Sequence, residues 1–462
     1  MRINNTYIKT GYFWLPNNSE KKIPGVLTIK NGGGIELEVI DLFKDNIKSL
    51  NGEDDFNRII GHIEDDGLVT LDDCFYTTKS ISFGGISKSK ICINKVLSGV
   101  AYDAQEEVTF ESLSFSVDCF NEWVSISGIK VENNWETNTT SINYSPPENI
   151  KIYLNNGMSL EIYFSYTLPT ASNVSEVKIT QNALFKIKST FPTPLNKFIE
   201  IAHKLTNLMC FAIDDIVTLQ DVTATSLEIY REYSNGKKHL IPIKVYYKSI
   251  PFTEKAVKKS WHQMLFVFNT IKSNFQDVVN NWLDAYEVID PALNLYFSVK
   301  TGSQKYIDSQ FLSLVQGLET YHRRTNSDTI MHSSEFDNLV STLVDFCPES
   351  HKEWLQGRLK HGNEINLGQR IKKTIEPFKS LFGNSKDRNK LIRKIVDTRN
   401  YLTHYSKELR DSAATDDELW IICQKMEVIL QLHFLKVIGF NDSEIHDVVQ
   451  NSRPMHYKLK EI

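Results

Sequence analysis

The sequence predicts an α+β protein of several domains, in which a β-rich N-terminal region with a sandwich-like fold precedes an all-α helical bundle. Three observations support this prediction. The chain has 462 residues, which is enough for two or three domains. Alternating apolar and polar residues, typical of strands, recur through the first half. From about residue 253 the apolar residues instead recur at helical spacing, and this change of period indicates at least two domains.

The strands expected in the first half lie between turn signals. The stretch Asn31-Gly32-Gly33-Gly34 separates two alternating runs, 26–29 and 35–39, which is the pattern of a β-hairpin. Asn235-Gly236 similarly marks the turn of a strand pair expected around 226–248. Other alternating runs are 113–117, 124–127 and 160–164. Short strands between Gly and Asn clusters favour a sandwich or a strongly bent antiparallel sheet.

The helices expected from apolar spacing begin inside the β region. One should start at Thr193-Pro194, since Thr is a good cap and Pro suits the first turn of a helix. The others fill the second half of the chain: 253–272, 275–288, 305–324, 334–346, 351–361, 367–382, 386–406, 415–438 and 442–450. We therefore expect a β-rich N-terminal domain over 1–250, a helical connector over 251–302 and a helical domain over 303–462.

The composition is that of an ordinary globular protein, and we expect a cytoplasmic location. No segment has the roughly 18 consecutive apolar residues of a membrane-spanning helix. The N-terminus shows no basic stretch followed by an apolar run, so no secretion signal is expected. The six cysteines are scattered without a CxxC pair, which argues against a cysteine-based zinc site and a disulfide framework. We expect no metal, no cofactor and no membrane partner.

Charge is distributed unevenly along the second half of the chain. Residues 351–410 contain 15 Lys and Arg against 6 Asp and Glu, a net of +9, whereas residues 411–450 contain 2 against 8, a net of −6. A basic surface would raise the local concentration of a polyanion such as RNA. A solvated helix face beside an acidic neighbour explains the same numbers, so charge alone does not decide between the two.

The residues best suited to catalysis lie in the helix expected over 386–406. An apolar stripe runs through 391–396, and steps of three or four residues extend it to Arg399, Asn400 and His404. An Arg can hold a phosphate, and a His can move a proton at neutral pH. Polar groups at positions where burial is expected are costly unless they are paired, so we expect these three to be catalytic. The alternative is a structural His with an Arg399–Asp397 ion pair.

The spacing of these residues bears on oligomeric state. Arg399 and His404 are five residues apart, roughly 140° around an ideal helix, so one copy alone would make a loose site. Two copies meeting across a two-fold axis would place both pairs around a single phosphate. Such a site suits transesterification of RNA, in which the 2′-hydroxyl attacks the neighbouring phosphate. We therefore expect an RNA substrate and a homodimer or higher even oligomer.

The wider sequence resembles two known families. Residues from about 305 to 450 are similar to the Apea-like HEPN family. Within them, Phe311–Glu319 resembles that family's first helix, and Lys394–His404, with its R-x4-H spacing, resembles the catalytic helix. The N-terminal half resembles the ApeA N-terminal domain. The stretches that carry this second resemblance are GYFWLP at 11–16, IPGVL at 23–27, IGH at 60–62 and VTLDDC at 69–74.

The resemblance implies a bacterial anti-phage protein that acts by abortive infection. Its C-terminal domain would be a metal-independent HEPN endoribonuclease that cuts cellular RNA, with tRNA as a candidate, and leaves 2′,3′-cyclic phosphate ends. Arg399, Asn400 and His404 would be catalytic. Glu319 would pair with a basic residue or pack at a dimer interface, and His322 and Arg323 would lie on the surface. The β-rich region would restrain the nuclease or sense a trigger, for which a phage-derived protein is a candidate.

A binding module is the alternative to a nuclease. HEPN folds also occur as non-catalytic RNA- or partner-binding domains, and the β-rich region would then carry the function by recognising a glycan or a phage protein. Tyr12, Phe13 and Trp14 are the aromatic residues that would line such a site, although we expect them to lie in the core of the β domain. Substitution separates the two interpretations, because only nuclease action requires Arg399 and His404.

Overall fold

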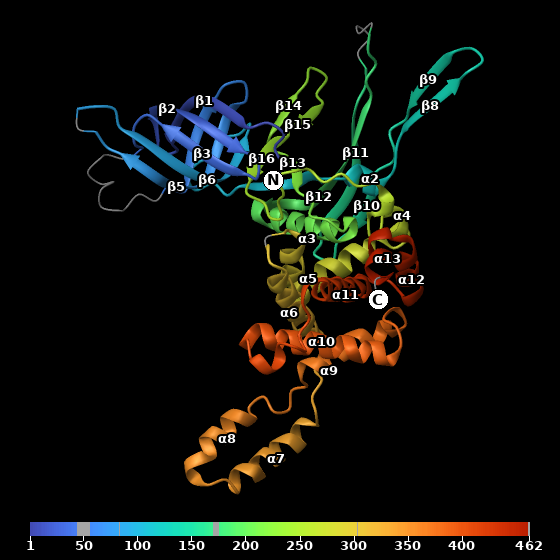
Figure 1. Cartoon of the computed structure of the whole chain (residues 1–462). Coiled ribbons are helices and arrows are strands. Elements are labelled where there is room, and N and C mark those ends of the chain that lie inside the picture. The colour runs from blue at the N-terminus through green and yellow to red at the C-terminus, as the bar shows by residue number, and fades with distance from the viewer. Residues whose placement is uncertain (44–55, 83, 170–174, 303, 461–462) are drawn as a thin grey trace. The chain divides into compact units, whose positions relative to one another are not determined.

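The computed structural model describes residues 1–43, 56–82, 84–169, 175–302 and 304–460. The chain divides into two compact units, residues 1–283 and 284–462. The first unit is built mainly of strands and the second of helices, which confirms the predicted α+β fold class (Figure 1). The domain limits expected near 250 and 303 stay predictions of where separately folding parts begin.

The elements of the first unit are mostly strands. The strands are β1 (Tyr7–Leu15), β2 (Asn18–Lys30), β3 (Gly34–Val39), β4 (Arg58–Ile63), β5 (Gly67–Ser80), β6 (Lys88–Ser98), β7 (Thr109–Val117), β8 (Ile129–Asn134), β9 (Thr139–Tyr144), β10 (Ile150–Tyr153), β11 (Ser159–Thr167), β12 (Thr180–Pro194), β13 (Leu219–Thr225), β14 (Tyr230–Glu232), β15 (Lys238–Leu240) and β16 (Ile243–Tyr247). The helices are α2 (Phe120–Val124), α3 (Leu195–Ile213), η1 (Trp261–Gln263), α4 (Phe268–Ile271) and the beginning of α5 (Phe275–Lys300).

Six strands of this unit close into a barrel. β1 pairs with β2 and β4, β2 with β3, β3 with β6, β6 with β5, and β5 with β4, all antiparallel. The predicted hairpin is confirmed as β2–β3, and Gly33 turns the chain there with a φ of +78°. The sequence favoured a sandwich-like region. A barrel uses the same short alternating strands, and that pattern does not specify which distant strands pair.

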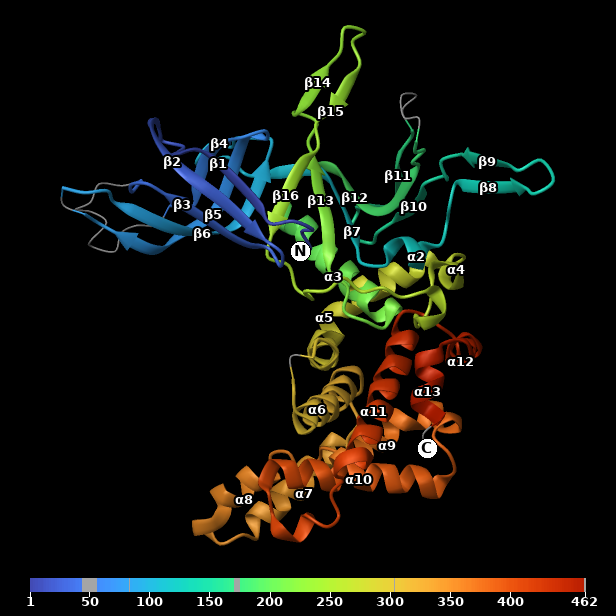
Figure 2. The ribbon, with the colours of Figure 1, turned by 45° about the horizontal axis from the view of Figure 1, so that its top comes forward.

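The rest of the large sheet extends from the barrel. β6 pairs with β16 through residues 95–98, and the strand order continues β16-β13-β7-β12-β11-β10. Helix α3 packs against β7 and β12, and its start follows the expected Thr193-Pro194 boundary. Two hairpins, β8–β9 and β14–β15, project as separate two-stranded ribbons (Figure 2). The strands predicted at 113–117 and 160–164 and the turn at Asn235-Gly236 are confirmed.

The strand predicted at 124–127 is wrong. Helix α2 ends at Val124, and residues 125–127 form neither helix nor strand, beginning with Ser125 at a φ of +53°. Phe120, Trp123 and Val124 are buried together because they share one face of the short helix. Trp123 Nε1 also donates to the Phe266 carbonyl at 3.0 Å. Contacts with distant parts of the chain therefore override the local alternation.

The helix predicted over 253–272 is also wrong, so the expected connector is helical only in η1, α4 and α5. Most of the segment is irregular and runs along the first unit. The amides of Leu265 and Phe266 donate at 2.9 and 3.2 Å to the carbonyl of Ala212, in the last turn of α3. Both side chains are about 3% exposed. Their burial accounts for the apolar spacing without a helix, which is why the periodicity misled the prediction.

The second unit consists of helices. They are the end of α5, α6 (Ile307–Thr325), α7 (Ser333–Asp345), η2 (Glu349–His351), α8 (Lys352–Leu359), α9 (Leu367–Ile375), η3 (Glu376–Leu381), α10 (Ser385–His404), η4 (Lys407–Leu409), α11 (Asp416–Val437), α12 (Asp442–Asn451) and α13 (Arg453–Lys460). The predicted helices in this unit are confirmed to within a few residues, with two differences. The expected 367–382 helix divides into α9 and η3, and the 275–288 helix continues to Lys300. Helix α13 was not predicted.

Helix α11 is the central helix of this unit. Every residue from Met426 to Leu435 is buried, and α6, α12 and α13 contact the helix. Leu419 and Ile422, earlier on the same helix, are buried as well, so most of the apolar residues of α11 are core. Among the described residues, no helix is long and apolar enough to cross a membrane.

The buried polar residues of α11 have specific partners. The Glu427 carboxylate accepts from Lys300 Nζ at 2.7 Å and from Lys458 Nζ at 2.8 Å. His433 Nε2 lies 2.9 Å from the Thr374 carbonyl, so this nitrogen carries the proton and donates it. Since α11 has no exposed side over these residues, these bonds fix α5, α13 and α9 around it.

Burial of His433 predicts a pH-dependent stability. Burial lowers the pKa of His433 to about 4, although its bond to Thr374 opposes the shift. Because this folded-state pKa lies below the unfolded value of about 6.5, the stabilisation is complete above pH 6.5 and is lost as pH falls toward 4. At about 1.4 kcal/mol per unit, His433 should account for roughly 3 kcal/mol of lost unfolding free energy across that range. Urea denaturation followed by helical circular dichroism measures the loss.

The comparison is with His433→Gln, whose amide can still donate to Thr374. The two proteins share every other ionisable group, including His322, Lys436 and the surface carboxylates. The difference between their stability curves against pH therefore isolates His433. The variant should lose clearly less stability than the wild type between pH 6.5 and 4. Identical losses in the two proteins would show that the ring does not stay neutral in the folded state.

Candidate functional site

Helix α10 carries the three candidate catalytic residues. A capping box fixes its N-terminus: Asn384 Oδ1 accepts from the amides of Lys386 and Asp387 at 2.8 and 3.1 Å. Asp387 Oδ2 in turn accepts from the Asn384 amide at 3.1 Å. The helix ends at His404, after which Tyr405 takes the left-handed conformation with a φ of +51°. The candidate residues therefore lie in the last two turns of a helix with well-defined ends.

The buried side of α10 is narrow. It faces α6 and α9, and its buried residues are Leu391, Ile395 and Thr398. Arg399 and Asn400 are half-buried, and His404 is exposed. These three residues do not continue the core of the helical unit, because the buried stripe continues to Thr398 instead. Their expected place at an interface stays a prediction. The candidate residues are open to solvent and to a ligand.

The structure joins two of the three candidate residues. Arg399 Nη1 donates to Asn400 Oδ1 at 3.2 Å. Within the described part of the chain, His404 makes no side-chain hydrogen bond to either of them, and Arg399 forms no ion pair with Asp397 or with another carboxylate. The remaining donors of the Arg399 guanidinium are thus available to an anion such as a phosphate.

Thr398 is a positioning residue that sequence reasoning missed. Its Oγ1 accepts from the Ala414 amide at 2.8 Å, and both residues are buried. This bond ties the last turns of α10 to the segment that leads into α11. The sequence signal that could have identified it is a Thr on the apolar stripe of a helix, where a buried hydroxyl needs a hydrogen-bond partner.

The polar residues of α6 are structural. Glu319 pairs with Arg323 at 3.0 Å, one of the two roles that the family resemblance implied for it. His322 was expected on the surface, but it is only 2% exposed. Its Nδ1 lies 3.3 Å from Arg370 Nη1, and a guanidinium only donates, so Nδ1 accepts and the ring is neutral. Burial and the Arg370 charge accordingly lower the pKa of His322. The ring lies out of solvent and is unsuited to proton transfer with a ligand.

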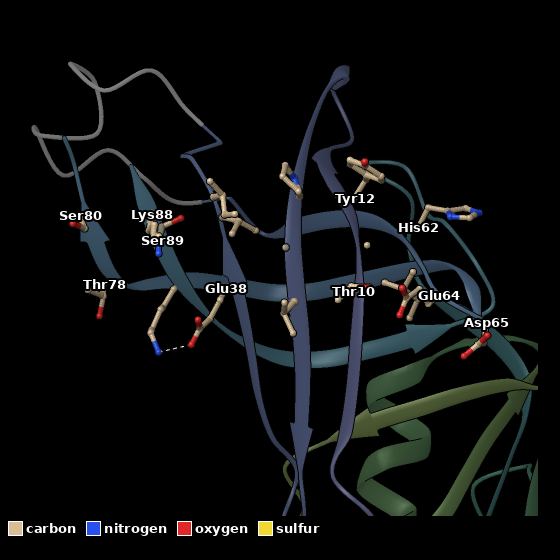
Figure 3. Close-up of a pocket in the computed structure, with 18 residues that line it drawn as sticks. Thr10, Tyr12, Glu38, His62, Glu64, Asp65, Thr78, Ser80, Lys88 and Ser89 are labelled. Carbon is tan, nitrogen blue, oxygen red and sulfur yellow. Dashed lines mark hydrogen bonds and ion pairs between the residues drawn. The ribbon is translucent and has the colours of Figure 1, made fainter. Parts of the chain in front are cut away.

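The barrel carries a concavity of about 930 Å³. In Figure 3, Tyr12 and His62 lie at one end of this concavity and Ser80 and Lys88 at the other. Tyr12 is 58% exposed, so its expected burial is wrong, while Phe13 is fully buried as expected. In an alternating strand, neighbouring side chains point to opposite faces, which separates these two aromatic residues.

A half-buried Arg-Asn pair and an exposed His five residues after the Arg lie at the end of one helix of a helical bundle, which is the arrangement that the HEPN resemblance implied. A family model described as Apea-like HEPN matches residues 312–444, and one described as ApeA N-terminal domain 1 matches residues 8–282. The second match covers more than half of the chain, which therefore belongs to the ApeA N-terminal domain 1 family. Comparisons with curated proteins and with solved structures gave no match.

The two family matches support an anti-phage HEPN protein. HEPN domains are generally nucleases, and they generally bind RNA and dimerise.

Replacing Thr398 should loosen the segment after the candidate site. In Thr398→Val the shape is kept but the Ala414 amide loses its buried acceptor, which should cost about 1–3 kcal/mol. Hydrogen exchange of the Ala414 amide measures the effect and should accelerate by about fivefold or more, since about 1.4 kcal/mol corresponds to a factor of ten. The control is Thr403→Val, because the exposed Thr403 hydroxyl only donates within its own helix. Unchanged Ala414 protection in Thr398→Val would remove the positioning role.

Proposed function

We propose that this protein is a HEPN endoribonuclease that cuts cellular RNA during phage infection. The observation that supports the proposal most is the half-exposed, hydrogen-bonded pair of Arg399 and Asn400 on the same helix end as the exposed His404. An arginine without a carboxylate partner in the described chain keeps its donors for an anionic ligand. The net charge of +9 over 351–410 favours RNA as that ligand.

The proposed reaction is an internal transesterification. The 2′-hydroxyl oxygen attacks the adjacent phosphorus, and the bond from phosphorus to the 5′-oxygen breaks. A base removes the 2′-hydroxyl proton, and an acid gives a proton to the departing 5′-oxygen, both of which are roles for imidazole. Arg399 stabilises the added negative charge on the phosphate oxygens, and Asn400 orients the arginine through the bond already present. The products are a 2′,3′-cyclic phosphate and a 5′-hydroxyl end.

A homodimer completes the proposed site. Arg399 and His404 point roughly 140° apart on one helix, so a single copy does not surround a phosphate. Two copies related by a two-fold axis bring two arginines and two histidines to one scissile group. One His404 then acts as the base and the other as the acid, which a single imidazole does only in successive steps.

The biological setting that we propose is abortive infection. Cutting RNA that translation needs, with tRNA as the candidate target, stops an infected cell before phage are released. The N-terminal unit restrains the nuclease or senses a trigger of phage origin, so the enzyme is latent in healthy cells. Metal ions have no part in this chemistry, because imidazole and guanidinium supply proton transfer and charge stabilisation.

Recognition by the β-rich unit without catalysis is the second candidate function. The concavity on the barrel favours it, because the exposed Tyr12 contributes apolar surface there while His62 and Lys88 contribute polar contacts. Under this proposal the helical unit binds RNA or a partner, and substitutions that abolish function lie within residues 1–250 instead of in α10.

The nuclease proposal predicts that Arg399→Ala and His404→Ala each lower RNA cleavage by at least a hundredfold, as expected for loss of a charge-stabilising or proton-transfer group. Purified protein is incubated with total bacterial RNA in EDTA, with and without lysate of phage-infected cells. Gel analysis of the RNA measures cleavage, and the wild type should cut with EDTA present.

Matched controls are Arg453→Ala and His446→Ala, which remove an exposed Arg and an exposed His from α13 and α12. Both should keep wild-type cleavage. Equal cleavage by wild type and His404→Ala would exclude His404 from the mechanism. Absence of cleavage under every condition, by protein that still protects cells from phage, would favour the recognition proposal.

A further inference from the structure

A second cavity lies between α10 and α11, near the beginning of α10. Its volume is about 270 Å³, and its lining combines charged and apolar side chains: Phe382, Asp387, Lys390, Leu391, Lys394, Glu418, Ile421, Ile422 and Lys425. The cavity is separate from the candidate catalytic residues. Lys390 and Arg399 are nine residues apart on α10, roughly 13 Å along the axis and on opposite sides of the helix.

The charges in this cavity are not balanced. Lys394 pairs with Glu418 at 3.0 Å, and the Asp387 carboxylate accepts from the Asn384 amide in the capping box of α10. Within the described part of the chain, Lys390 and Lys425 have no ion-pair partner. The exposed Lys390 and the half-buried Lys425, from neighbouring helices, therefore line one small cavity without an ion pair. Its lining holds three lysines against two carboxylates, those of Asp387 and Glu418.

Lys425 is the more constrained of the two. It lies on α11 and is half-buried, and burial and then the nearby Lys390 charge lower its pKa. Desolvation and like-charge repulsion both disfavour this arrangement in the unoccupied protein. Asp387 and Glu418 offset these effects only in part, and a bound anion would further offset the repulsion between the two lysines.

The remaining lining suggests what kind of anion fits. Phe382, Ile421 and Ile422 give the cavity an apolar wall, and the first turn of α10, whose positive dipole end favours negative charge, lies beside it. A volume of about 270 Å³ is at the lower limit for small-molecule sites, which suits one nucleotide unit. We propose that this cavity binds the phosphate of a single nucleotide unit through Lys390 and Lys425, either within an RNA strand or as a free mononucleotide.

Binding measurements on the full chain test the proposal. The probes are fluorescently labelled adenosine monophosphate and a labelled ten-nucleotide RNA, read by fluorescence anisotropy at fixed ionic strength. All proteins carry His404→Ala so that the RNA stays intact. Lys390→Gln and Lys425→Gln should each weaken binding of at least one probe by about tenfold or more, as expected for loss of a charge-assisted hydrogen bond. The matched control is Lys386→Gln, an exposed lysine on the same helix that does not line the cavity.

Each outcome of the binding measurements either supports or overturns the nucleotide-binding proposal. Weaker binding of both probes identifies a site for a free nucleotide, and weaker binding of the RNA alone identifies a contact with the RNA strand. Equal losses in Lys386→Gln and the two cavity variants would show a diffuse charge effect and overturn the proposal, as would unchanged affinities or the absence of saturable binding. Cleavage is not measured here, so failure of this proposal is distinguishable from failure of the proposed nuclease.

Discussion

The helical unit depends on the burial of α11 on every side. Apolar residues surround this helix from Met426 to Leu435, so each polar side chain in that stretch must find a partner inside the protein. Glu427 finds two lysines, from α5 and α13, and His433 finds a carbonyl of α9. Removing one member of such a buried set leaves an unpaired charge, which is why these bonds determine the arrangement of the helices. Helix α6, which also packs on α11, in turn holds α10.

This arrangement leaves α10 buried along one narrow side. Its other sides are free to carry chemistry that a core helix could not hold: Arg399 and Asn400 near its end, and Lys390 near its beginning. Arg399 is half-buried and Lys390 is exposed, and neither forms an ion pair within the described chain, so both keep their donors for a ligand. The unpaired Arg399 and the unpaired lysine at the beginning of α10 therefore favour a role in binding anionic ligands over a role in stability.

The sequence predicted the secondary-structure elements better than it predicted the contacts between them. Helical spacing located α6, α10 and α11, and a glycine turn located the β2–β3 hairpin, because these signals are local. The prediction from sequence failed where contacts with residues distant in the chain determine the local structure. Apolar spacing at 264–268 reflects burial against α3, and the closure of the barrel depends on pairings that no local pattern encodes.

The candidate site was likewise predictable from the sequence only in part. The R-x4-H spacing identified Arg399 and His404, but their exposure and the buried Thr398–Ala414 bond required the structure. The lysine cavity joins residues 35 positions apart on two helices, and neither lysine belongs to a motif.

The most direct test of the central claim, that α10 directs RNA cleavage through the 2′-hydroxyl, uses a defined RNA with a mapped cut. The same RNA is prepared with one 2′-deoxynucleotide on the 5′ side of that cut. The account predicts that the wild-type protein cuts the all-ribose RNA to a 2′,3′-cyclic phosphate and leaves the substituted position intact. Cleavage at the deoxy position at the original rate would contradict it, because water would then be the nucleophile.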